Sequence, residues 1–176
     1  MKLAIRYFGH PDLRMKAKPV PEINEEIRKI VSDMLETMLS MDNCIGFAGP
    51  QLGIPYRIFV IREEKMGSDN QYYLGDPEVI INPVLSAPSK ELFVMQEGCM
   101  SLPGLHIEVV RPGKVHISYQ TLDGRTVEED VIDFRARMMM HENDHLNGTL
   151  TIDRMDPKER KKIEPLLREM KEKYNS

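Results

Sequence analysis

Two histidines and a glutamate near the C-terminal end of the chain could together carry out metal-assisted chemistry. They lie in the stretch MMMHENDHLNG, residues 138–148, as His141, Glu142 and His145. On a helix the two imidazoles would share one face and reach a single metal ion, with the glutamate beside them. A carboxylate at such a site can accept the proton of an attacking water molecule. The pattern therefore favours a metal-dependent hydrolase over two unrelated histidines.

A catalytic site of this kind needs a third protein ligand and an open position. One candidate is Glu164, placed downstream as in a metallopeptidase, although it directly precedes a proline in a highly charged segment. The other candidate is Cys99, upstream in QEGCMSLPG. A thiolate would suit a metal of borderline softness and disfavour Mg or Ca. The residue types alone leave both ligands open.

The histidines require a rigid helix to hold them. Asp133 is the expected N-cap of this helix and Gly148 the expected C′ residue. Met139 and Leu146 would face away from the histidine stripe. A helix that is apolar on both sides of a polar stripe should be buried rather than lie on the surface.

Two further helices are predicted outside the metal site. Apolar side chains recur every three or four residues from Asn24 to about Met41, which is typical of an amphipathic helix. Asp156 and Pro157 form a suitable N-cap and first residue for a last helix, which Pro165 should break or kink. Residues 1–23 contain three prolines and are expected to form an irregular arm.

The middle of the chain is expected to form antiparallel strands. An Asp-Gly hairpin turn at 123–124 separates two segments, the first with apolar and polar residues in alternation. Residues 44–55, rich in glycine and proline, should form no regular element, and the polar segment 63–77 should be a surface loop. The predicted strands are Arg57–Ile61, Glu78–Ile81, Leu92–Met95, His106–Val110, Lys114–Gln120 and Thr126–Ile132. Strands followed by helices indicate an α+β fold.

Composition and length describe one ordinary globular domain, residues 1–176. Charged residues make up 30% and hydrophobic residues 41%, with no apolar run long enough to span a bilayer. The N-terminus lacks a signal-peptide core, so we expect a cytoplasmic protein with Cys44 and Cys99 reduced. A net charge of −4 argues against nucleic-acid binding over an extended surface.

Three motifs give the chain a specific resemblance. HENDHLNG at 141–148, EGCMS at 97–101 and GFAGPQ at 46–51 occur in the order, and at about the separations, of the signature motifs of peptide deformylases. The likeness covers nearly the whole chain. It implies an α+β fold in which antiparallel strands surround a buried metal-binding HExxH helix, with an N-terminal and a C-terminal helix. It also implies a hydrolase that removes the formyl group from the N-terminal formyl-methionine of nascent polypeptides and releases formate.

The resemblance also assigns roles to residues. Metal ligands would be Cys99, His141 and His145, with Fe(II) as the cellular metal and Zn, Ni or Co tolerated. Glu142 would be the general base, while the side-chain amide of Gln51 and the backbone N–H of Met100 would stabilise the oxyanion. Glu97 would pair with Arg111 behind the site. Residues expected to contact the substrate are Ile45, Gly46, Phe47, His106, Phe134 and Met138.

Several positions depart from the family pattern. They are Cys44, Phe47, Gly49, His106 and Met140. These changes leave the ligands, the base and the oxyanion amide in place, so activity is expected, but they also suggest an alternative in which a deformylase-like domain binds peptides with little turnover. Cys44 is expected to be a buried, inert thiol, or else to form a disulfide with Cys99 on oxidation. No pattern in the sequence indicates a role for Arg137.

The C-terminal segment is locally basic. Between Pro157 and Ser176 there are seven Lys or Arg residues and four Glu residues. Mixed charge is common on the solvated face of an exposed helix. A second interpretation is that this helix docks on the ribosome.

Overall fold

The computed structural model describes residues 1–174 and confirms the predicted α+β fold. The helices are α1 (Glu25–Leu39), α2 (Asp133–Leu146) and α3 (Pro157–Tyr174), with short 3-10 helices at Pro11–Arg14, Gly49–Leu52 and Thr151–Arg154. The strands are β1 (Gly46–Ala48), β2 (Ile58–Ile61), β3 (Glu64–Met66), β4 (Tyr72–Leu74), β5 (Glu78–Ser86), β6 (Leu92–Gly98), β7 (His106–Pro112), β8 (Lys114–Gln120) and β9 (Thr126–Ile132).

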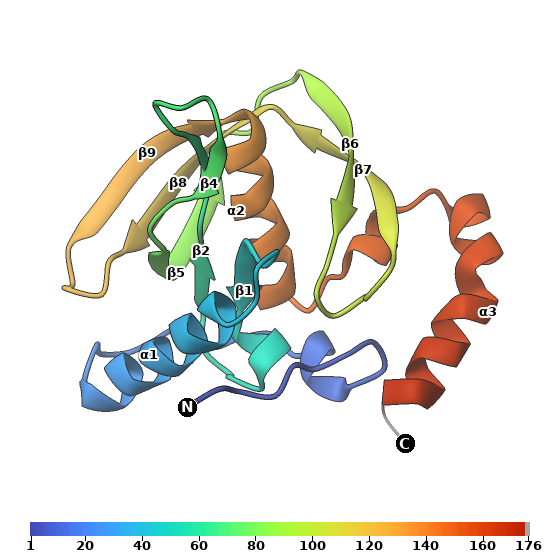
Figure 1. Cartoon of the computed structure of the whole chain (residues 1–176), viewed down its shortest axis with the longest axis horizontal. Coiled ribbons are helices and arrows are strands. Elements are labelled where there is room, and N and C mark those ends of the chain that lie inside the picture. The colour runs from blue at the N-terminus through green and yellow to red at the C-terminus, as the bar shows by residue number, and fades with distance from the viewer. Residues whose placement is uncertain (175–176) are drawn as a thin grey trace.

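The strands form one large antiparallel sheet and two separate pairs. The five-stranded sheet has the order β1-β2-β5-β8-β9, whereas β3 pairs with β4 and β6 pairs with β7. In Figure 1, α2 runs between the five-stranded sheet on one side and the β6–β7 pair on the other. The helix that carries the two histidines is therefore enclosed by strands, as expected.

Alternation along the strands explains how α1 and α2 cover different faces of the large sheet. Along β2, Ile58 and Val60 pack with the apolar side of α1, whereas Phe59 and Ile61 pack with α2. Successive side chains of a strand point to opposite faces, so one short apolar strand serves two cores. Asn24 begins α1 by accepting a hydrogen bond from the backbone N–H of Ile27 at 3.0 Å.

A third apolar cluster lies between the β6–β7 pair and the end of the chain. Ile107 and Val109 of β7 pack there with Leu13 of the N-terminal arm and with Leu167 and Met170 of α3. The basic helix α3 is thus attached through its apolar side, and the rings of Tyr7 and Tyr174 stack with centroids 4.2 Å apart. Its charged side chains are left on the outer face.

Two segments predicted to be irregular contain regular structure. The short hairpin β3–β4 lies inside the expected loop 63–77, with mostly exposed residues. Residues 44–55 contain β1 and a 3-10 helix, because Gly46 to Ala48 pair with Phe59 to Ile61 of β2. The local composition predicted these segments wrongly, because it does not report the antiparallel pairing of β1 with β2 or of β3 with β4.

Two predictions about helix ends also need correction. Pro165 does not break the last helix, which runs on to Tyr174. Asp133 is the first residue of α2 rather than its N-cap, with φ at 51°, and its N–H donates to the carbonyl of Gly113 at 2.8 Å. Gly148 has the left-handed conformation expected just beyond the helix, with φ at 73°. Within residues 1–174, no helix has the length and apolar character needed to cross a lipid bilayer.

Candidate metal centre and catalytic cleft

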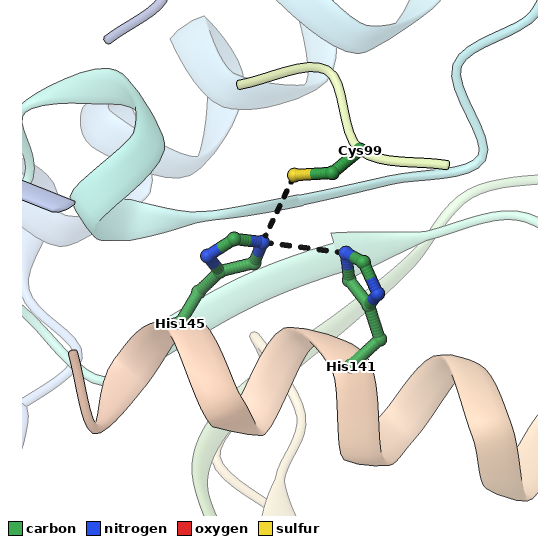
Figure 2. Close-up of side chains that lie close together, drawn as sticks. All are labelled: Cys99, His141 and His145. Atoms are coloured by element: carbon green, nitrogen blue, oxygen red, sulfur yellow. Dashed lines mark hydrogen bonds between the residues drawn. The ribbon is translucent and has the colours of Figure 1, made fainter. Parts of the chain in front are cut away.

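The side chains of Cys99, His141 and His145 converge on one point (Figure 2). The two Nε2 atoms lie 3.3 Å apart, and the Cys99 Sγ lies 3.3 Å from the Nε2 of His145. All three ligand atoms lie within 4.8 Å of one another. Two imidazoles and one thiol are a donor set that fits a divalent ion of borderline softness. The residues present therefore form a possible metal-binding group.

The ring of His141 is oriented from behind by Glu97. Its Nδ1 lies 2.9 Å from the Glu97 Oε2. Because the carboxylate accepts, Nδ1 carries a hydrogen, and Nε2 is turned toward the other two ligands. Glu97 is itself held by Arg111, whose Nε and Nη2 lie 2.6 and 2.9 Å from its two oxygens. The expected pairing of Glu97 with Arg111 is confirmed.

The ring of His145 is fully enclosed. It is 1% exposed, and its Nδ1 is buried with no hydrogen-bond partner among the described residues. Burial and the neighbouring His141 hold the pKa of His145 well below its ordinary value. The lowered pKa favours the neutral ring, which is the form that a metal ligand requires.

Glu142 lies at the edge of the same site. It is 5% exposed, and one of its oxygens, Oε2, has no hydrogen-bond partner among the described residues. Burial raises the pKa of Glu142 to about 7, although the nearby His141 opposes the shift. A carboxylate with a pKa near neutrality can both accept and return a proton at physiological pH.

The amide of Gln51 is fixed in one orientation. Its Oε1 accepts from the backbone N–H of Ala48 at 2.9 Å, so its Nε2 points the other way. This Nε2 lies 3.1 Å from the Ser101 Oγ and 3.5 Å from the Cys99 Sγ. An N–H donor is thus aimed at the metal group, and Met100, the second expected donor, follows Cys99 directly.

A cavity of about 410 Å³ opens beside these side chains. Its lining includes most of the residues that the sequence indicated for substrate and chemistry: Ile45, Gly46, Gln51, Cys99, Met100, His106, Phe134, Met138, His141 and Glu142. The cavity therefore brings the apolar candidates and the reactive groups to one place. His145 is enclosed behind it.

Two candidate residues lie elsewhere. Phe47 is fully buried among the side chains that pack on α1, because on β1 it points to the face opposite Gly46 and Ala48. Its expected place in the substrate pocket is wrong. Glu164 is exposed on α3 and does not belong to the ligand group, so the structure does not support it as the third ligand.

No pattern in the sequence indicates a role for Arg137, yet this residue lines the cavity and is 4% exposed. Its guanidinium donates to the Glu97 Oε1 at 2.7 Å. It also donates to the backbone carbonyls of Phe93 and Val109, at 2.7 and 3.0 Å. These partners lie 28 to 44 residues away in the chain, so no local pattern indicates them and only the folded structure reveals the role of Arg137.

Comparison with known proteins agrees with this site. The family model described as polypeptide deformylase matches residues 2–161. A peptide deformylase of Microchaete diplosiphon is 41% identical over 154 residues, which are 88% of this chain and 79% of that protein.

Solved structures of the same kind share the fold. The peptide deformylase of Plasmodium falciparum is 32% identical with a TM-score of 0.85, covering 98% of this chain and 97% of that one. A Met-Ala-Ser-bound peptide deformylase of Acinetobacter baumannii is 30% identical with a TM-score of 0.79, covering 88% of this chain and 99% of that one. The chain therefore belongs to the polypeptide deformylase family.

Proposed function

We propose that this protein hydrolyses the formamide at the N-terminal formyl-methionine of nascent polypeptides, releasing formate and a free amine. The observation that carries the proposal is the convergence of Cys99, His141 and His145 beside Glu142 at the wall of one cavity. The bound Met-Ala-Ser of the Acinetobacter relative supports a peptide that begins with methionine. An apolar wall that includes Phe134 and Met138 would suit such a side chain.

The family is metal-dependent, and Cys99, His141 and His145 would hold the ion. Bound there, a divalent ion would supply Lewis acidity toward water and a carbonyl oxygen. We propose Fe(II) as the cellular metal, with Zn, Ni or Co able to replace it, because imidazole and thiolate ligands suit all four. The thiol ligand also suits a reducing compartment, so we propose that the protein acts in the cytoplasm.

Groups of the protein itself would transfer the proton and stabilise the negative charge that develops on the formyl oxygen. Glu142 would take a proton from water as the new C–O bond forms, and return it to the amine nitrogen as the C–N bond breaks. The Gln51 amide and the Met100 N–H would donate to the formyl oxygen. Losing one such donor typically raises the barrier by about 3 kcal/mol.

Substrate contacts are proposed for the remaining cavity residues. The main chain of Gly46 would pair with the extended peptide as an added strand. Ile45, Phe134 and Met138 would contact the methionine side chain, and His106 would contact the peptide beyond it. These assignments rest on the placement of the four side chains and Gly46 in the cavity wall.

Formate release from formyl-Met-Ala-Ser by anaerobically prepared Fe(II) protein tests the proposal. Glu142→Ala should bind the same amount of iron but release formate roughly 10²- to 10⁴-fold more slowly. Equal rates in the two proteins would remove Glu142 from its role. Metal-loaded wild-type protein without formate release would favour the deformylase-like binding domain instead.

We also propose that the basic helix α3 contacts the ribosome. The proposal is supported by the exposed position of Lys161 and Lys162, opposite the apolar side that packs on the domain. Reversing both charges to Glu should reduce co-sedimentation with ribosomes at low salt. Reversal of the exposed Lys65 and Lys90, which lie outside α3, is the matched control. Unchanged co-sedimentation of the α3 variant would contradict the proposal.

A further inference from the structure

The side chain of Arg137 connects α2 to the β6–β7 pair of strands. The β6–β7 pair is separate from the five-stranded sheet. From α2, the Arg137 guanidinium reaches the carbonyl of Phe93 and the carboxylate of Glu97 on β6, and the carbonyl of Val109 on β7. One buried side chain thus contacts both strands of the pair at three acceptors.

The position of this pair relative to α2 determines the geometry of the ligand group. Cys99 directly follows the last residue of β6, whereas His141 and His145 are on α2. The distance from the sulfur to the two imidazoles is therefore set by how β6 lies against the helix. A tie between helix and strands that is one turn away from His141 acts directly on that distance.

Arg137 also acts on the carboxylate that orients His141. Glu97 is 7% exposed and accepts hydrogen bonds from Arg111, Arg137 and His141. Removing one partner from a buried ionic cluster leaves uncompensated charge and is strongly destabilising. Without Arg137, the two main-chain carbonyls would lose a donor, and Glu97 would keep only Arg111 and His141 as partners.

We propose that Arg137 is a positioning residue of the metal centre, which fixes the thiol of Cys99 and the ring of His141 relative to each other. Its effect on catalysis rests on the proposed function. Its effect on metal retention does not, because retention can be measured without substrate.

Cobalt(II) is the probe for the test, because its absorption spectrum reports thiolate coordination. Wild-type protein, Arg137→Met, Arg137→Lys and Arg135→Met are loaded with Co(II), and the loss of the thiolate absorption is followed after addition of a chelator. Arg135 is the matched control: it lies on the same helix but pairs with Glu78 at 2.8 Å and Glu129 at 2.9 Å. Loss of a partner behind a metal ligand typically weakens metal binding 10- to 100-fold.

Arg137→Met is therefore expected to release Co(II) at least about tenfold faster than wild type, with a weakened thiolate band. Arg137→Lys keeps the charge but reaches fewer acceptors. Its rate of Co(II) release should therefore lie between the rates of wild type and Arg137→Met. Arg135→Met should match wild type. Equal release by Arg137→Met and wild type would overturn the proposal, as would equally fast release by Arg135→Met.

If Arg137→Met does not fold, the comparison of Arg137→Lys with Arg135→Met decides, and equal release by these two variants would overturn the proposal. Formate assays on the wild-type protein test the proposed function separately from the positioning role of Arg137. Failure of wild type to release formate contradicts the proposed function, while the cobalt comparison still tests the role of Arg137.

Discussion

The backbone of Gly46 lies directly against the carboxylate of Glu142. A Cβ atom built on Gly46 would lie closer to the Glu142 Oε1 than real side-chain contacts allow. Gly46 does not have the left-handed backbone conformation that favours glycine. An alanine at position 46 would therefore force the carboxylate of Glu142, the proposed general base, to move.

Gly46→Ala should lower the kcat for formate release by at least about tenfold, because the added methyl group displaces the Glu142 carboxylate. The metal content and the thermal unfolding temperature should change little, since the backbone at this position accepts alanine. Steady-state kinetics on formyl-Met-Ala-Ser provide the measurement. A variant with wild-type kcat would show that Glu142 can move aside and still work.

Arg62 supports the segment that leads into the cavity wall. It is 9% exposed, and its guanidinium donates to the carbonyls of Cys44 and Met41, at 2.8 and 2.7 Å. Its backbone N–H donates to the carbonyl of Ile45 at 2.9 Å. Ile45 and Gly46 line the cavity, so this support bears on substrate binding.

We expect Arg62→Met to raise the KM for formyl-Met-Ala-Ser several-fold and leave kcat nearly unchanged, because the ligands and Glu142 are untouched. The loss of charged hydrogen bonds should also lower the free energy of unfolding by about 2 kcal/mol. Arg28→Met, which removes an exposed arginine that donates to the carbonyl of Leu122, is the control. An unchanged KM for Arg62→Met would refute this role.

The two thiols should differ sharply in reactivity. Cys44 is fully buried, and burial raises the pKa of its thiol to about 12, whereas Cys99 lines the cavity. In metal-free protein at pH 8, a thiol-specific disulfide reagent should modify one cysteine rapidly and the second only after denaturation. Cys99→Ser should remove the rapid phase. Two rapid phases would instead favour the disulfide hypothesis for Cys44 and Cys99.

Asp153 should contribute stability that depends on pH. Burial alone would raise its pKa, but Arg14, the backbone N–H of Leu150 and Arg160 outweigh burial and lower the pKa below the ordinary value. A carboxyl group with a lowered pKa in the folded state stabilises the protein above its unfolded pKa, near 4, and loses this contribution as the pH falls through the folded value.

Asp153→Asn should therefore lower the free energy of unfolding at pH 7, and the difference from wild type should shrink from about pH 4 downward. The pairs are partly exposed, so we expect a difference of about 1 kcal/mol or less. Urea denaturation at pH 7 and pH 3 measures it. A difference that stays constant between these pH values would mean that Asp153 acts through its shape and not its charge.

Local patterns in the sequence predicted α1 well, because its apolar side packs along one continuous stripe. The capping side chain of Asn24 and the left-handed Gly148 also follow from residue type. The same rules failed for β1, whose short apolar piece is stabilised by β2. Periodicity describes a residue by its neighbours in sequence, and β1 depends on neighbours in space.

The candidate site shows the same division. Spacing alone grouped His141 and His145, and the resemblance added Cys99, because short motifs preserve the residues that do the chemistry. Arg62 and Arg137 escaped prediction because their partners are mostly main-chain carbonyls, which every residue has. The position of Phe47 was predicted wrongly because successive side chains of a strand point to opposite faces. Gly46 lines the cavity, whereas Phe47, one residue further along β1, points into the core.

The three candidate metal ligands come from two separate parts of the chain. Cys99 precedes β7, and His141 follows β9, so an ion held by both closes the intervening chain into a loop. Such a closure restricts the unfolded chain and acts like a reversible crosslink. A ligand that binds only the folded state also shifts the unfolding equilibrium in proportion to its supply. The cellular lifetime of this protein would then depend on metal availability, because molecules without a bound ion would unfold more often and be degraded first.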